Sequence, residues 1–248
     1  MHIFTKESLL GMAQENWQKD AFEKFEAKML DKNKPFPCIP ATQGYQLHRF
    51  RYGFVSIPNK NASSKQLAQL LEDYSKTFRE IGSFTSLIVF YEPSSDLHEN
   101  TSVEKFEQFF WEQLNLLHEF DQIEWPNHIP VDPHDSLWEF CFHGEQYFMY
   151  CATPAHKQRV SRHFPYFMLA ITPRFVLEEF SSTASNAAKI KASIRKRLSE
   201  YDSIDIHPNL NTYGNKDNYE WKQYFLHDDD TSLAQCPFHS IRKKTSKD

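Results

Sequence analysis

Glycine is scarce in this chain, which has 6 glycines in 248 residues. The two glycine-rich loops that cradle phosphate groups, G-x-G-x-x-G and G-x-x-x-x-G-K-[ST], are both missing from it. The H-E-x-x-H zinc motif and the G-x-S-x-G turn of serine hydrolases are missing as well. The sequence therefore lacks the usual motifs for nucleotide binding, zinc-dependent proteolysis and serine hydrolysis.

Long hydrophobic runs are also missing. No segment approaches the ~18 consecutive apolar residues that a membrane span needs. The first residues, Met1 to Glu7, contain no apolar signal core. A net charge of −5 gives no electrostatic reason to expect nucleic-acid binding. We therefore expect a cytoplasmic protein without a membrane or nucleic-acid partner, and the oligomeric state stays open.

Cysteines are few and widely spaced. The four are Cys38, Cys141, Cys151 and Cys236, and no C-x-x-C pair occurs among them. This spacing predicts reduced thiols rather than a disulfide framework. Cys236 and His239 form only half of a zinc site, which is weak support for a bound metal.

Hydrophobic periodicity predicts alternating helices and strands. Apolar residues at helical spacing predict helices over 8–30, from Ser63 or Ser64 to about 78, 101–117 and 183–199. Short apolar or alternating runs predict strands at 46–57, 84–91, 137–142, 147–152 and 167–171. Three prolines predict an extended loop at 33–40. We predict one α+β domain over residues 1–241, with a mainly antiparallel sheet flanked by helices, and a basic tail at 242–248.

The stretch from Ser136 to Phe180 is the most informative part of the sequence. Two aromatic-rich strands surround a tight turn at His143 to Glu145, and the polar segment Thr153 to Arg162 follows the second strand. Side chains on a loop that follows a rigid strand are held still yet reachable. A lone histidine such as His156 is more often a packing or surface residue than a ligand. Residue types alone therefore leave its role open.

Several short motifs occur in a recognisable order along the chain. They are Phe36-Pro37-Cys38, Trp138-x-Phe-x-Phe-x-Gly144, Thr153-Pro154-Ala155-His156-x-x-Arg159-x-Ser161-Arg162, Pro173-Arg174 and Cys236-Pro237-Phe238. In order and spacing they resemble the YqcI/YcgG family over most of the chain. Members of that family include haem-dependent enzymes that hydroxylate a nitrogen of a guanidino group. The resemblance implies haem b as cofactor, with O2 and an external electron-donor protein as partners.

The resemblance also implies roles for particular residues. His156 would be the axial ligand of the haem iron, with Cys236 or Cys38 as thiolate alternatives. Aromatic side chains, Trp138 among them, would form the apolar slot. The haem propionates would bind three arginines, which are Arg159, Arg162 and Arg174.

A guanidinium substrate would need a carboxylate beside it, because an acid and a guanidinium form a bidentate pair. Glu139, Asp135 and Glu145 are the candidates, on nearness in sequence alone. The expected function is thus O2-dependent N-hydroxylation of arginine or a related small guanidino or amine metabolite. The alternatives are a haem-binding or haem-handling protein without catalysis, and a cofactor-free interaction module whose basic helix at 183–199 contacts an anionic surface.

Overall fold

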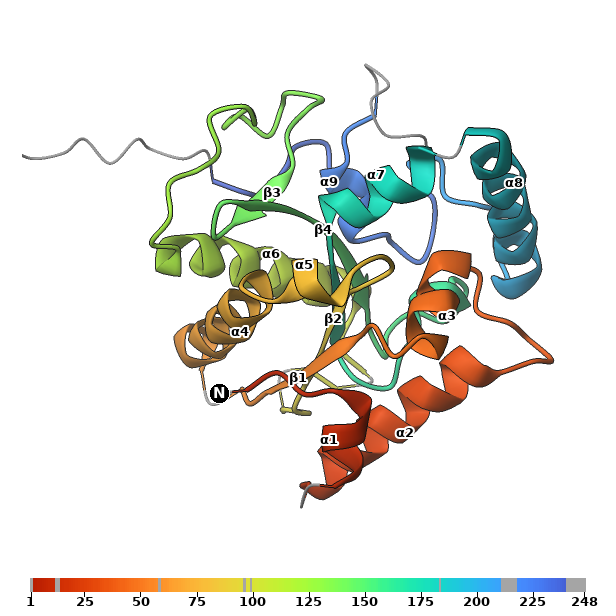
Figure 1. Ribbon diagram of the computed structural model, residues 1–248, viewed down its shortest axis with the longest axis horizontal. Coiled ribbons are helices and arrows are strands. Elements are labelled where there is room, and N and C mark those ends of the chain that lie inside the picture. The colour runs from red at the N-terminus through yellow and green to blue at the C-terminus, as the bar shows by residue number, and fades with distance from the viewer. Residues whose placement is uncertain are drawn as a thin grey trace, which may run out of the picture.

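A five-stranded mixed sheet forms the centre of the described part of the chain (Figure 1). The computed structural model describes residues 2–239 apart from 12–13, 58, 96, 99, 183 and 211–217, so the tail predicted at 242–248 lies outside the described residues. The strands, in the spatial order β1-β2-β5-β4-β3, are β1 (Arg51–Val55), β2 (Leu87–Tyr91), β3 (Phe140–Phe142), β4 (Glu145–Ala152) and β5 (Met168–Pro173). Only the β1–β2 pair is parallel, and the other three pairs are antiparallel. The prediction of an α+β domain with a mainly antiparallel sheet is confirmed.

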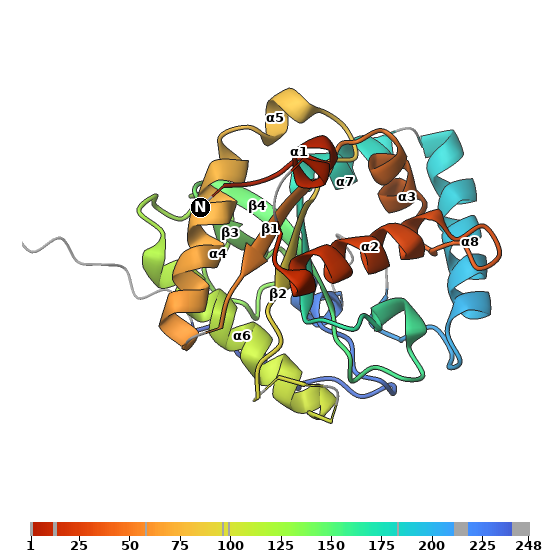
Figure 2. The same cartoon turned by 90° about the horizontal axis from the view of Figure 1, so that it is seen from below.

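Helices cover both faces of this sheet (Figure 2). One face packs against α1 (Lys6–Leu10), α2 (Asn16–Leu30) and α3 (Ile39–Gln46). The other packs against α4 (Lys60–Ser75), α5 (Phe78–Ile81) and α6 (Val103–Phe120). The remaining helical elements are the 3-10 turn η1 (Val160–Arg162), α7 (Arg174–Ser182), α8 (Ala184–Tyr201) and α9 (Trp221–Tyr224). Within the described ranges, none of these helices combines the length and the apolar character needed to cross a bilayer.

Strand β2 shows why an almost continuous apolar run was needed at 84–91. Successive side chains of a strand point to opposite faces, so a strand covered on both sides must be apolar at every position. Leu87, Val89 and Tyr91 belong to the core beneath α4 and α6, whereas Ile88 and Phe90 belong to the core beneath α2. All five residues of β2 are buried.

The β3–β4 hairpin closes at the predicted place, but its turn has two residues and not the three predicted, because Glu145 already belongs to β4. Phe142 pairs with Glu145, which leaves His143 and Gly144 as the turn residues. Both have positive φ, 53° and 76°, as a type I′ turn requires, and glycine meets this requirement without strain. The turn fixes the register of β4 and hence the point at which the chain leaves the sheet after Ala152.

Two predictions near the N-terminus are wrong. The single helix expected over 8–30 is two helices, because α1 ends at Leu10 before Gly11, and Leu10 is 71% exposed rather than buried. The loop expected to extend to residue 40 gives way to α3, which begins at Ile39. Pro40 stands in the first turn of α3, where its missing N–H has no partner to lose, so this proline does not break the helix. The following strand is correspondingly shorter than predicted.

Candidate active site

The polar segment that follows β4 forms a closed loop at the end of the sheet. Thr153 and His163 pair across its base, with backbone hydrogen bonds from Thr153 N to Arg162 O and from Phe164 N to Thr153 O. The loop between them carries His156, Arg159 and Arg162, as the sequence predicted for residues at the end of a buried strand. All three are buried, at 5% exposure or less.

Both ring nitrogens of His156 are occupied by hydrogen bonds. Nε2 lies 2.7 Å from the carbonyl oxygen of Leu226, and Nδ1 lies 2.8 Å from Oγ1 of Thr153. A carbonyl oxygen can only accept, so Nε2 donates and Nδ1 accepts the hydroxyl proton of Thr153. Burial lowers the pKa of His156 to about 4, which leaves the ring neutral at pH 7. In this arrangement no lone pair of His156 faces an open position.

Arg159 is fully buried and its guanidinium donates to three backbone carbonyls, with the Asp230 carboxylate 3.5 Å away. It donates to His227 O at 2.9 Å, Asp205 O at 3.1 Å and Asp229 O at 2.9 Å. The carboxylate of Asp228 accepts from the backbone N–H groups of residues 157–159 at 2.8 to 3.1 Å. The loop therefore holds residues 227–230 on one side by its backbone and on the other by Arg159.

Arg162 makes a second set of contacts to the same part of the chain. Its guanidinium donates to Tyr224 O at 3.0 Å, Gln223 O at 2.9 Å and Cys151 O at 3.3 Å. It also stacks 4.3 Å above the centre of the Tyr150 ring. In the structure, the motif from Thr153 to Arg162 thus fastens the segment 223–230 to the end of β4.

Arg174 and Glu139 lie together in a second buried cluster. Arg174 Nε is 2.6 Å from Glu139 Oε2, and the same guanidinium also pairs with Glu220. Tyr224 donates its hydroxyl to Glu220 Oε1 at 3.1 Å. Burial and the nearby charge of Glu139 raise the pKa of Glu220 to about 7, against the opposing effect of Arg174. In this arrangement Glu139, the carboxylate predicted to bind a substrate guanidinium, is paired instead with the guanidinium of Arg174.

The other predicted carboxylates lie on the surface. Asp135 is exposed and accepts the backbone N–H of Leu137 at 2.9 Å, which closes a turn. Both carboxylate oxygens of Glu145 accept from one nitrogen of Arg79, Nη2, at 2.7 and 2.8 Å. Each carboxylate therefore already has a local structural partner.

Trp138 and Cys236 share one core, beneath α6. Trp138 packs against Phe238 with ring centroids 5.3 Å apart, and its indole Nε1 is buried without a hydrogen-bond partner among the described residues. Burial raises the pKa of the Cys236 thiol to about 12. The adjoining backbone is tied to α6 through Asn115, which donates to Pro237 O at 3.1 Å.

Cys38 lies on the opposite face of the sheet from Cys236. It is half-buried immediately before α3 and packs against the core beneath α2. Burial raises the pKa of its thiol, although the charge of Arg162 opposes the shift. The two cysteines and His156 are thus alternatives that the fold does not bring to a common centre.

These contacts test whether the predicted residues fit a haem. A haem ligand needs a free nitrogen lone pair or a thiolate, and propionates need unpaired cationic donors. His156 has neither nitrogen free, burial disfavours both thiolates, and the three arginines donate to carbonyls and carboxylates of the chain. As arranged here, the predicted set does not fit a resident haem. No cluster of three or more His, Cys, Asp or Glu side chains suited to a metal occurs in the described ranges either.

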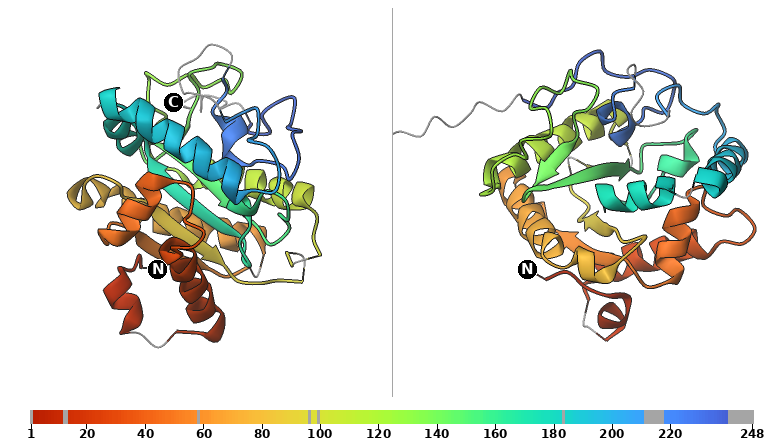
Figure 3. Two further views of the ribbon diagram at one scale, coloured as in Figure 1. Left: turned by 90° about the vertical axis from the view of Figure 1, so that its right-hand side faces the viewer. Right: turned by 45° about the horizontal axis from the view of Figure 1, so that its top comes forward.

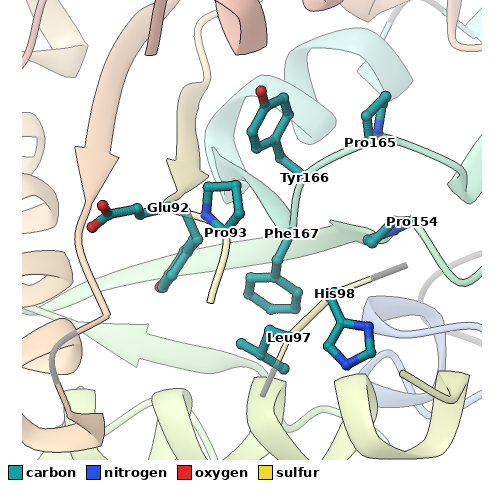
Figure 4. A pocket seen from close by; sticks show the side chains of 9 residues that line it. Glu92, Pro93, Leu97, His98, Pro154, Pro165, Tyr166 and Phe167 are labelled. Carbon is teal, nitrogen blue, oxygen red and sulfur yellow. The ribbon is translucent and has the colours of Figure 1, made fainter. Parts of the chain in front are cut away.

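The loop of residues 153–162 after β4 is called the motif loop below. A pocket of about 290 Å³ lies beside it (Figure 4). It lies at the end of the sheet where β2 and β4 finish and β5 begins. Its lining residues are Tyr91, Glu92, Pro93, Leu97, His98, Pro154, Pro165, Tyr166 and Phe167. The volume is at the lower end of the range for small-molecule sites.

Glu92 is the charged residue of this lining. Its carboxylate has no hydrogen-bond or ion-pair partner among the residues that the structure describes, and Figure 4 shows it at the rim, pointing away from the other labelled side chains of the lining. Sequence reasoning did not select Glu92 or any other lining residue as a site. The available signal was its position: a carboxylate directly follows the fully buried run Leu87 to Tyr91.

A second hollow, of about 450 Å³, is chemically different. It lies at the amino end of β1, and its lining includes His48, the two guanidinium groups of Arg49 and Arg51, and one carboxylate, Glu80. Two guanidinium groups there repel a cationic substrate. The pocket beside the motif loop is therefore the better candidate for a guanidino compound.

Comparison with known proteins identifies relatives over nearly the whole chain. The model of the YqcI/YcgG family matches residues 25–239. The uncharacterized protein YqcI of Bacillus subtilis (strain 168) is 43% identical over 98% of this chain and 93% of its own length. The uncharacterized protein YcgG of the same organism is 42% identical over 99% of this chain and 98% of its own length.

A more distant relative has a name that states an activity. It is a Streptomyces lavendulae protein provisionally named N(omega)-hydroxy-L-arginine synthase DcsA. It is 30% identical over 90% of this chain and 84% of its own length. No solved structure matches the chain. The match of the family model and the identity to YqcI and YcgG show that this chain belongs to the YqcI/YcgG family.

Proposed function

We propose that this protein is an oxygenase that hydroxylates a nitrogen of a guanidino group on arginine or a related small metabolite. The observation that carries the proposal is the similarity to the hydroxyarginine synthase over 90% of this chain. The reaction inserts one oxygen atom of O2 into an N–H bond and reduces the other atom to water. Two electrons and two protons are consumed, so an external electron donor is required.

The pocket beside the motif loop supports a guanidino substrate. Turned toward the cavity, Glu92 would offer two oxygens to the parallel N–H groups of a guanidinium, which is the preferred geometry for this pair. Tyr166 is half-buried and would provide an aromatic surface for a planar cation, whereas Tyr91 and Phe167 are buried and pack against each other. Pro154 ties the pocket to the motif loop, two residues before His156. The roles of the chain's own residues would be to bind the guanidinium, fix its orientation and limit the water around it.

Haem b is the cofactor that we propose, on the family resemblance alone. It would supply the activation of O2 when bound. Ligation by His156 would require the chain to break the bond from Thr153 or the bond to Leu226, and ligation by Cys236 or Cys38 would require a buried thiol to ionise. Glu139 and Asp135 stay predictions as substrate-binding residues, as does Trp138 in an apolar slot.

Two measurements test the proposal. The first is an absorption spectrum of protein expressed with ample haem precursor, recorded oxidised, reduced, and reduced with carbon monoxide. A Soret band is expected, and its position with carbon monoxide distinguishes histidine from thiolate ligation. A colourless protein that does not take up added haem would contradict the cofactor and favour a cofactor-free interaction module.

The second measurement is product formation from a panel of small guanidino compounds with O2 and a chemical reductant, followed by mass spectrometry. A product heavier than the substrate by one oxygen atom is expected. Haem binding without product from any guanidino compound would contradict the proposed reaction and favour a haem-handling protein.

A further inference from the structure

Helix α8 concentrates positive charge in a chain that is otherwise acidic. Five of its 18 residues are Lys or Arg and one is Glu, which gives the helix a formal charge of +4. Because the whole chain carries −5, the rest of the chain carries −9. Such a separation of charge attracts partners of opposite sign and speeds their association.

Four of the five cations of α8 are exposed, Arg197 is half-buried, and Arg195 donates to Leu210 O at 3.0 Å. Ala187 is buried and Ile190, Ile194 and Leu198 are half-buried, which defines the inner face of the helix. Lys189 and Lys196 are exposed on the side opposite this stripe, and Lys191 is exposed along one of its flanks. Figure 3 (left) shows α8 lying across the surface of the molecule that faces the viewer.

These three lysines are little used within the molecule. Lys189 and Lys191 have no ion-pair partner in the described ranges, and Lys196 approaches Glu200 only to 3.9 Å. Ion pairs within the molecule therefore do not explain the presence of these lysines. Their charge is thus available to a partner.

The C-terminal end of α8 is fastened to the motif loop. The carboxylate of Asp202, which follows the helix, accepts Ser161 N at 2.6 Å and Ser161 Oγ at 2.9 Å. The ring of Tyr201 packs against Phe36, with centroids 6.0 Å apart. A partner on α8 would therefore sit on a fixed surface directly beside the loop that carries Arg162.

We propose that the exposed surface of α8 is the docking surface for a small acidic electron-transfer protein. This inference rests on the proposed function, because N-hydroxylation with O2 consumes two electrons that the chain must receive from outside. Electron-transfer complexes have small interfaces in which complementary charge sets the rate of encounter. A helix of 18 residues is about 27 Å long, which is enough for such an interface.

Charge reversal tests this assignment. The test variant carries Lys189→Glu, Lys191→Glu and Lys196→Glu. The matched control carries the same changes at Lys19, Lys65 and Lys105, which are exposed on α2, α4 and α6. The match is close because Lys19 approaches Glu23 at 3.8 Å, much as Lys196 approaches Glu200. A second test variant, with glutamine at the three α8 positions, removes the charge without reversing it.

The probe is a plant-type [2Fe–2S] ferredoxin, and its affinity is measured by titration at low and at high salt. The α8 reversal is expected to weaken binding at least about tenfold at low salt, the glutamine variant less, and the control by less than about twofold. Binding by the unchanged protein should weaken as salt increases. Circular dichroism confirms that each variant is folded.

Equal weakening in the α8 and control variants would overturn the docking surface. So would binding of anionic phospholipid vesicles or duplex DNA through α8 with no binding of ferredoxin. The titration does not depend on turnover, so it separates this inference from the proposed reaction. Hydroxylation with a chemical reductant but without α8-dependent ferredoxin binding overturns only the docking surface. Ferredoxin binding without hydroxylation of any guanidino compound overturns only the reaction.

Discussion

Nε2 of His156 lies 2.7 Å from the carbonyl oxygen of Leu226, 70 residues further along the chain. This bond joins the loop after β4 to the segment that crosses it, and the hydroxyl of Thr153 occupies the other ring nitrogen. His156 thus holds two distant parts of the chain together. Its structural role and any role as an iron ligand compete for the same two nitrogen atoms.

His156→Ala should destabilise the fold by about 2–4 kcal/mol, because it leaves a buried carbonyl and a buried hydroxyl unpaired and opens a cavity. Urea unfolding measures the change. His128→Ala is the control, since His128 is exposed, and it should stay within about 0.5 kcal/mol of the unchanged protein. Equal stability of the two variants would show that the His156 bonds do not hold the segment.

The neutral His156 also predicts a dependence of stability on pH. Its folded-state pKa is about 4, below the ordinary 6.5, so the unfolded chain binds more protons between these values. The stability that the neutral His156 contributes is complete above pH 6.5. As the pH falls toward 4, the free energy of unfolding loses up to about 3 kcal/mol of this contribution. The unfolding free energy of a His156→Gln variant should fall less over this interval. Parallel pH profiles would contradict the assignment.

The raised pKa of Glu220 predicts a dependence of the unfolding free energy on pH with the opposite sign. Burial and Glu139 raise its pKa, so the folded chain binds more protons than the unfolded chain between the ordinary and the raised value. The stability that this proton contributes is complete below the ordinary pKa of a glutamic acid and declines as the pH rises toward 7. Glu220→Gln should remove the decline, as measured by unfolding at several pH values. A variant that keeps the decline would show that another group causes it.

Arg159→Lys should cost about 2–4 kcal/mol although it keeps the charge, because lysine cannot supply the fork of donors that reaches three carbonyls. Arg79→Lys is the matched control. Arg79 pairs with Glu145 at the surface, where such a pair contributes less than about 1 kcal/mol. Equal losses in thermal or urea unfolding would argue against the clamp formed by Arg159.

Glu92→Gln should weaken binding of L-arginine at least about tenfold, since it replaces a charge-assisted bidentate pair by neutral hydrogen bonds. Glu119→Gln, on the exposed side of α6, should leave the affinity within about twofold. Isothermal titration calorimetry measures both. Unchanged affinity in Glu92→Gln would remove this pocket as the guanidino site.

Local sequence signals predicted the five strands and the long helices but not the short helices or the long-range contacts. The hairpin and β2 follow from turn chemistry and from the apolar run, both of which lie within a few residues. The parallel pairing of β1 with β2 depends on packing of α4 between them in the chain, which no local pattern states. The helix α3 was missed because Pro40 was interpreted as a loop residue, although the first helical turn accepts proline.

The candidate site shows the same limit. The sequence indicated that polar groups follow a buried strand, and the structure places His156, Arg159 and Arg162 in one loop there. It did not show that their partners are carbonyls of residues 223–229, because backbone acceptors have no sequence signature. Glu92 was missed for a related reason: one carboxylate after a strand gains meaning only when the fold places it at the rim of a pocket.

The measurement that tests the proposed function most directly is turnover of L-arginine under 18O2 with a reductant, followed by mass spectrometry of the product. The account predicts a hydroxyguanidino product that contains one 18O atom, and much less of it from Glu92→Gln than from Glu119→Gln. A product without the label, or no product from any guanidino compound although the protein is folded and loaded with haem, would contradict it.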